Sequence, residues 1–143
     1  MTNPYRVLVT GSRDWHRHEL VCLALDAAFC EATNSGRLMT LVHGACPRGA
    51  DDQAADWANY MISRDLPIKV EAHPANWEIN GKRAGFIRNA HMVNLGADLC
   101  LAFIRNHSRG ASHTAALAEK AGIPTRRFTN APVQCPAPEE QQP

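Results

Sequence analysis

The sequence predicts an α/β protein: a Rossmann-like, doubly wound, mostly parallel five-stranded sheet with helices on both faces. Five short apolar or β-branched runs alternate with four segments of helical periodicity, and this alternation favours parallel strands joined by right-handed crossovers. Polar, glycine-containing loops follow three of the runs. The chain has 143 residues, 45% hydrophobic and 20% charged, which is typical of one globular domain.

Four elements are expected in the first half of the chain. The β-branched run Arg6–Thr10 is a buried strand, and helical spacing of apolar residues predicts a helix over His18–Ala32. A second strand is expected at Leu38–His43 and a second helix at Asp51–Arg64. One apolar stripe of that helix contains Ala54, Trp57, Ala58, Met61 and Ile62, which assigns Trp57 to the core.

The second half repeats the pattern. A more peripheral strand is expected at Ile68–Ala72, a helix within residues 81–95, and a central strand at Asp98–Ile104. The polar loop 105–114 precedes a small-residue helix over 115–121, and a fifth strand lies at Pro124–Phe128. Residues 1–128 therefore form a single domain, and the proline-rich tail 129–143 is expected to be disordered.

Charge and composition narrow the expected partners. The formal net charge is +1, which argues against nucleic acid, because non-specific binding to phosphates needs a basic face. Five cysteines in odd number suggest free thiols, and the histidines lack metal-ligand spacing, so no metal site is expected. The N-terminus enters a strand without a long apolar run, which favours a cytoplasmic protein and no membrane partner. Homo-oligomer formation is left open.

Three loops carry the candidate site: 11–15, 44–51 and 108–114. Each follows a strand, and in doubly wound sheets ligands bind at the carboxyl ends of the strands. Glycines let backbone N–H groups approach an anion, and a following helix points its positive end at the same place. None of the loops matches the GxGxxG or GK[ST] fingerprints. Asp51 has a second interpretation, as a residue that only caps its helix.

Four motifs occur in order between Tyr5 and Phe128: TGSRDW, HGACPRGADDQAADWA, HPANWEINGKRAGFIRNAHMV and RGASHTAALAEKAGIP. Together they resemble the YspA-like, cpYpsA-related family of the SLOG superfamily, which is related to DprA and LOG proteins. The resemblance implies a Rossmann-like fold whose glycine loops bind nucleotides or nucleotide-derived ligands. No cofactor is expected. It also implies which residues face the ligand: Gly11, Ser12, Arg13, Gly44, Gly49, Asp51, Arg88, Asn89, Gly110, His113 and Thr114.

One departure from the related LOG enzymes concerns catalysis. Their PGGxGTxxE loop, aligned on Thr114, places Leu117 where the acid would stand. Without that carboxylate, cleavage of an N-glycosidic bond lacks the group that would stabilise an oxocarbenium-like state or activate water. Asp14, Asp51 or Glu119 could take the place of this acid, and Asp51 is the candidate catalytic residue.

Three functions are therefore weighed. The first is a nucleotide-binding or sensing protein that uses Arg13 and Arg88 for phosphate, Asp51 for ribose, and Trp15 or Trp77 for base stacking. The second is an N-glycosidase acting on nucleoside monophosphates, and the third is single-stranded DNA binding of the DprA kind. Loop packing is the alternative role for both tryptophans, and ion pairing with Asp14 or Asp98 is the alternative role for both arginines.

Overall fold

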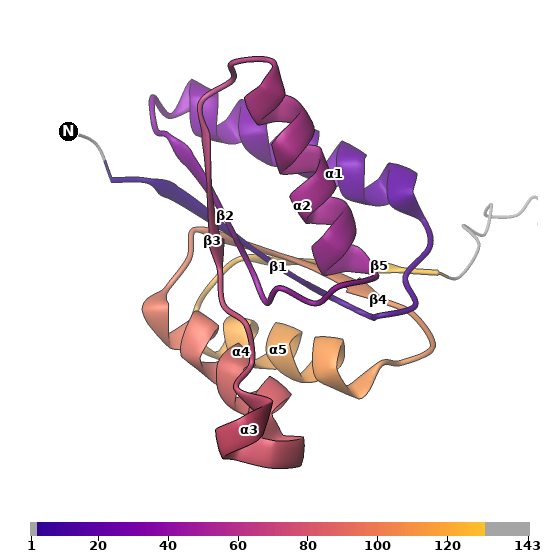
Figure 1. Ribbon diagram of the computed structural model, residues 1–143. Helices are drawn as coiled ribbons and strands as arrows, with labels where there is room; N and C mark the ends of the chain where they lie inside the picture. The colour runs from indigo at the N-terminus through magenta and orange to yellow at the C-terminus, as the bar shows by residue number, and fades with distance from the viewer. Residues whose placement is uncertain (1–2, 131–143) are drawn as a thin grey trace, which may run out of the picture.

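The computed structural model describes residues 3–130, which contain a five-stranded sheet in the order β3-β2-β1-β4-β5 (Figure 1). Every neighbouring pair of strands is parallel, so the predicted doubly wound architecture is confirmed. The strands are β1 (Tyr5–Gly11), β2 (Met39–His43), β3 (Ile68–Ala72), β4 (Leu99–Ile104) and β5 (Thr125–Thr129).

Helices cover both faces of the sheet, as the sequence predicts. The helices α1 (His18–Asn34) and α2 (Ala50–Ser63) pack together on one face, and α4 (Ala84–Leu95) and α5 (Arg109–Lys120) pack together on the other (Figure 1). The short α3 (Trp77–Asn80) and the 3₁₀ turn η1 (Gly81–Arg83) join β3 to α4. The sheet is therefore enclosed by two helical layers, and its two ends hold the loops.

The core follows from the alternation of side chains along the central strands. Val7 and Val9 of β1 pack toward α1 and α2, whereas Leu8 between them packs toward α4 and α5. All three are fully buried, because a strand covered on both faces turns successive side chains into two separate cores. Each such burial stabilises the fold by about 1.5–3 kcal/mol. These two cores fix the positions of the strand ends.

Most predicted bounds agree with the structure to within two residues, and two segments differ by more. The helix expected at 115–121 begins six residues earlier, because Ser108 takes the N-cap position of α5 and its carbonyl accepts the N–H of Ser112 at 3.0 Å. The candidate residues Gly110, His113 and Thr114 thus lie within a helix rather than in a loop. The segment before α4 is also broken, since Gly81 has a φ of 59° that ends α3.

The proposed C-terminal tail lies almost wholly outside the described residues. Thr129, its first residue, is the last residue of β5, where β-branched side chains fit an edge strand. In the described part of the chain, none of the helices combines the length and the apolar character that crossing a bilayer requires.

Two glycines allow β1, α2 and β4 to meet. A Cβ on Gly11 would overlap the Cβ of Ala50 and lie 3.0 Å from the carbonyl oxygen of Phe103, and a Cβ on Gly49 would overlap the carbonyl oxygen of Ser12. Gly49 also has a φ of 80°, a conformation that L-residues with side chains rarely adopt. The end of β1 and the start of α2 therefore touch through their backbones.

We expect Gly49→Ala to lower the free energy of unfolding by at least about 2 kcal/mol, from left-handed backbone strain and from the overlap with Ser12. Gly110→Ala is the matched control. A Cβ there meets nothing within 4 Å, and alanine favours α5 by up to about 1 kcal/mol. Urea unfolding of both variants measures the difference, and equal stabilities would contradict the role given to Gly49.

Candidate functional site

The carboxyl ends of β1 and β4 mark the point where strand order reverses. The chain proceeds from β1 to β2 on one side and from β4 to β5 on the other, and such a switch point opens a crevice for ligands. Ser12 joins the two strand ends: its N–H donates to the carbonyl oxygen of Phe103 at 2.9 Å, and its Oγ accepts the N–H of Arg105 at 2.8 Å. The loops that line this crevice are therefore fixed at their roots.

A pocket of about 550 Å³ lies at this switch point. We call it the arginine pocket, and it is lined by Gly11, Arg13, Asp14, Arg48, Arg105, Asn106 and Ser108. The three arginines come from three different loops, after β1, β2 and β4. Ser108 stands at the N-cap position of α5, whose first N–H groups have no intrahelical partner and whose dipole is positive at this end. The pocket is thus suited to an anion.

The three guanidinium groups differ in how they are held. Arg105 Nη1 donates to the backbone oxygen of Asp14 at 3.3 Å and to its Oδ2 at 3.4 Å, while its buried Nε has no hydrogen-bond partner in the described chain. Arg13 lies over the ring of Trp77, 5.7 Å from the centroid. The exposed Arg48 makes no ion pair within residues 3–130. Most of the hydrogen-bonding capacity of these arginines is open to a ligand.

A second hollow, the aromatic hollow, adjoins the arginine pocket. It has a volume of about 360 Å³ and is lined by Arg13, Cys46, Pro47, Arg48 and Trp77. Arg13 and Arg48 also line the arginine pocket, so the two hollows share a wall. Trp77 is 50% exposed and offers its ring to this space. Of the two predicted stacking residues, Trp77 is therefore placed where a base can reach it.

Trp15 is not so placed, and the prediction that it stacks on a base is corrected. Its side chain is only 2% exposed. The ring packs against Phe103 with centroids 5.4 Å apart, and its Nε1 donates to the carbonyl oxygen of Arg17 at 3.0 Å. A buried indole that has satisfied its N–H in this way is part of the core. The loop-packing alternative describes Trp15.

Asp51 holds the loop after β2. Its Oδ2 accepts the N–H of Gly44 at 3.1 Å and the N–H of Cys46 at 3.3 Å, instead of capping its own helix, which begins after Gly49. Burial raises the pKa of Asp51 to about 6, although these hydrogen bonds and the charge of Arg88 act to lower it. Asp51 is buried and lines neither of the two hollows.

Arg88 is also committed to the loops. Its Nη1 donates to the carbonyl oxygens of Gly44 and His73, and its Nε donates to Oδ1 of the buried Asn89 at 2.7 Å. A Cβ on Gly44 would lie 2.7 Å from Arg88 Nη1, so glycine at this position makes room for the arginine. Arg88, which is held by Asn89, therefore ties α4 to the ends of β2 and β3.

Two further candidates, Thr114 and His113, lie in α5, one of them buried and the other exposed. Thr114 is fully buried and its Oγ1 donates to the carbonyl oxygen of Gly110 at 3.0 Å, within α5. His113 is exposed but packs edge-on against Phe86 of α4, with centroids 5.2 Å apart. The predicted phosphate-facing role of Thr114 is corrected, because its hydroxyl is enclosed by the helix. The ion pairs considered for Arg13 and Arg88 do not form, since Asp14 pairs with Arg105 and Asp98 with Arg37.

Sequence reasoning missed the residues that complete the arginine pocket: Arg48, Arg105, Asn106 and Ser108. All four lie in or beside the predicted loops, and Arg105 directly follows the most apolar strand. Their position after a strand was a usable signal, but only the strand order brings the three loops together. Across residues 3–130 no group of three or more His, Cys, Asp or Glu is arranged to hold a metal ion.

The pKa of Asp51 leads to a pH prediction. Because the folded-state pKa of about 6 exceeds the ordinary value of 3.8, the folded protein binds the proton more readily than the unfolded chain. The free energy of unfolding should therefore fall as pH rises from about 4 through 6, by about 3 kcal/mol in total. Asp51→Asn removes the titration and should flatten this dependence.

Denaturant unfolding between pH 5 and pH 7 measures about 1.3 kcal/mol of this fall, with little interference from Glu71. Arg6 holds the pKa of Glu71 at about 2, so the stabilisation from its ionised form is lost only as pH falls from about 4.5 toward 2. Parallel curves for the wild type and Asp51→Asn would show that Asp51 does not titrate in this range.

Comparison with known proteins agrees with the geometry of the strands and loops. The sequence profile of the YspA, cpYpsA-related SLOG family, YAcAr, matches residues 5–79. The Gene 61 protein of Mycobacterium phage D29 is 44% identical over 127 residues, which cover 89% of this chain and 98% of that protein. No solved structure matches the chain. The chain belongs to the YspA, cpYpsA-related family of SLOG proteins.

Proposed function

We propose that this protein binds a nucleotide or nucleotide derivative, with a phosphoryl group of the ligand in the arginine pocket. The supporting observation is the convergence of Arg13, Arg48 and Arg105 from three loops at the point where strand order reverses. Guanidinium groups bind phosphate oxygens with paired hydrogen bonds, which makes arginine well suited to this task. Membership of the SLOG family supports a nucleotide-related ligand.

The expected hydrogen-bond free energies and the volume of the pocket are sufficient for binding a small ligand. A hydrogen bond to a charged group contributes about 1.5–3 kcal/mol, and three or four of them can support micromolar binding, about 8 kcal/mol, after the cost of ordering the ligand. The pocket volume of about 550 Å³ is within the usual range for small-molecule sites.

The aromatic hollow supplies a place for the base. Trp77 is half exposed there, and Arg13 and Arg48 lie between this hollow and the arginine pocket. Stacking of a base on an aromatic ring contributes about 1–3 kcal/mol. In this proposal the phosphate binds at the switch point and the base extends toward α3.

The proposal predicts a phosphate-specific loss of affinity in Arg48→Ala. Binding of AMP should weaken about ten- to hundredfold, because one charged donor is removed, while the much weaker binding of adenosine is unchanged. The side chain of Arg48 is exposed and makes no ion pair within residues 3–130, so the fold is preserved. Isothermal titration calorimetry with both ligands measures the two affinities.

Arg64→Ala is the matched control for Arg48→Ala. Arg64 lies at the C-terminal end of α2, whose N-terminal end adjoins the pocket, and its guanidinium stacks over Tyr60. The variant removes the same charge at the far end of the same helix and should bind AMP as the wild type does. Equal losses for AMP and adenosine in Arg48→Ala would rule out a phosphate role for Arg48.

N-glycosidic cleavage is a second candidate, favoured by one observation. The pKa of Asp51 is raised to about 6 by burial, near the range in which a carboxyl group serves as a general acid or base close to neutral pH. The hydrogen bonds from Gly44 and Cys46 commit one of its oxygens to the loop. Catalysis through Asp51 therefore needs the loop to open and admit the substrate.

Release of adenine from AMP, followed by chromatography, tests this candidate. If Asp51 is the acid or base, the wild type releases adenine and Asp51→Asn loses at least about a hundredfold of the rate. Release at an equal rate by the variant would assign the chemistry elsewhere. Binding of AMP without release would support the first proposal alone.

A further inference from the structure

The arginine pocket contains its own anion. Asp14 is the one acidic residue among the described residues that line it. Its carboxylate stands 3.4 Å from Arg105 Nη1, and the two side chains are 58% and 33% exposed. With three guanidinium groups and one carboxylate, the lining has a net charge of +2. A bound phosphoryl group and Asp14 would therefore be like charges that share one set of arginines.

We propose that Asp14 is a specificity-determining residue that weakens the binding of a ligand in proportion to its negative charge, and so lowers the advantage of a polyphosphate over a single terminal phosphate. This inference rests on the proposed nucleotide-binding function and states which nucleotides the site prefers. A phosphate monoester has a charge of about −2 near neutral pH, which matches the +2 of the lining. Each further phosphate adds a negative charge that Asp14 repels without adding an arginine.

The contacts of Asp14 suit this role. Exposed ion pairs contribute little to stability, and the Asp14–Arg105 contact is long, so the carboxylate can be displaced from the guanidinium at small cost. The backbone on either side is held independently, by the hydrogen bonds of Ser12 and by the burial of Trp15. Replacement of Asp14 should therefore change the charge of the pocket and leave its shape.

Coulomb's law gives the proposal a quantitative form. For charges about 6 Å apart in a solvent-like dielectric, removing one carboxylate strengthens binding about threefold for each unit of ligand charge. Relative to the wild type, the affinity of Asp14→Asn should then be unchanged for adenosine and higher by about threefold for cyclic AMP, about tenfold for AMP and about thirtyfold for ADP. The logarithm of the gain is proportional to the charge of the ligand.

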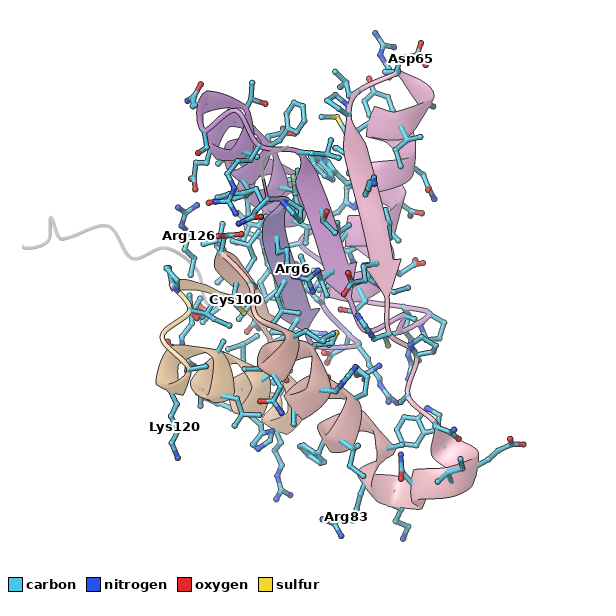
Figure 2. All side chains as sticks on the ribbon, turned by 90° about the vertical axis from the view of Figure 1, so that its left-hand side faces the viewer. Arg6, Asp65, Arg83, Cys100, Lys120 and Arg126 are labelled. Carbon is cyan, nitrogen blue, oxygen red and sulfur yellow. The ribbon has the colours of Figure 1, made fainter. Side chains whose placement is uncertain are left out.

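Calorimetric titration of the full chain with these four ligands at low salt tests the proposal. Asp14→Ser should give the same series as Asp14→Asn, because both variants remove the charge with different side chains. Asp65→Asn is the matched control, because Asp65 follows the C-terminal end of α2, whose N-terminal end adjoins the pocket. In Figure 2 it lies at the end of the molecule opposite to Arg83. Asparagine accommodates its φ of 63°, and the variant should show no charge-dependent gain.

The outcomes separate this inference from the proposed function. A gain that rises with ligand charge in both Asp14 variants and not in Asp65→Asn supports the role of Asp14. Gains that do not depend on charge, or a loss of adenosine binding, overturn it while the binding of AMP by the wild type still supports the proposed function. Failure of the wild type and of both Asp14 variants to bind any phosphate at millimolar concentration overturns both proposals.

Discussion

The backbone contact between the end of β1 and the start of α2 is the constraint on which the site depends. Gly11 and Gly49 lack the side chains that would force these segments apart, and Ser12 then connects the end of β1 to β4. The loops carrying Arg13, Arg48 and Arg105 therefore converge at one end of the sheet. Both glycines make room for the protein's own backbone, and Gly11 also lines the arginine pocket.

The arginines at this end of the sheet have two different tasks. Arg88 is partly buried and spends its donors on the carbonyl oxygens of Gly44 and His73, so it stabilises the loops. Burial lowers its pKa, as expected for a charge taken out of water. In the proposed function, the exposed Arg13 and Arg48 offer their donors to the ligand. A chain with a net charge of only +1 can thus concentrate positive charge locally, which a total charge does not reveal.

The two carboxylates near the site also differ: Asp51 stabilises a loop, whereas Asp14 is proposed to affect which ligands bind. Asp51 is buried and holds the loop by accepting two of its N–H groups. Loss of these hydrogen bonds would leave a buried carboxyl group unsatisfied, which destabilises the fold. Asp14 stands at the surface in a weak pair with Arg105 and is free to respond to a bound anion. The tryptophans show the same contrast between the buried Trp15 and the half-exposed Trp77. In each pair, burial separates a structural residue from one that can meet a ligand.

The sequence by itself determined the fold class, the order of elements and the core assignment of Trp57, because hydrophobic periodicity and strand–helix alternation are local signals. It also located the three loops that contain the pocket residues. Only the tertiary structure decided which side chains in those loops line the arginine pocket. Strand order brings Arg48 beside Arg105, and packing turns Trp15 inward and closes Thr114 inside α5. Such choices depend on contacts between residues far apart in the chain, and no spacing along the sequence encodes them.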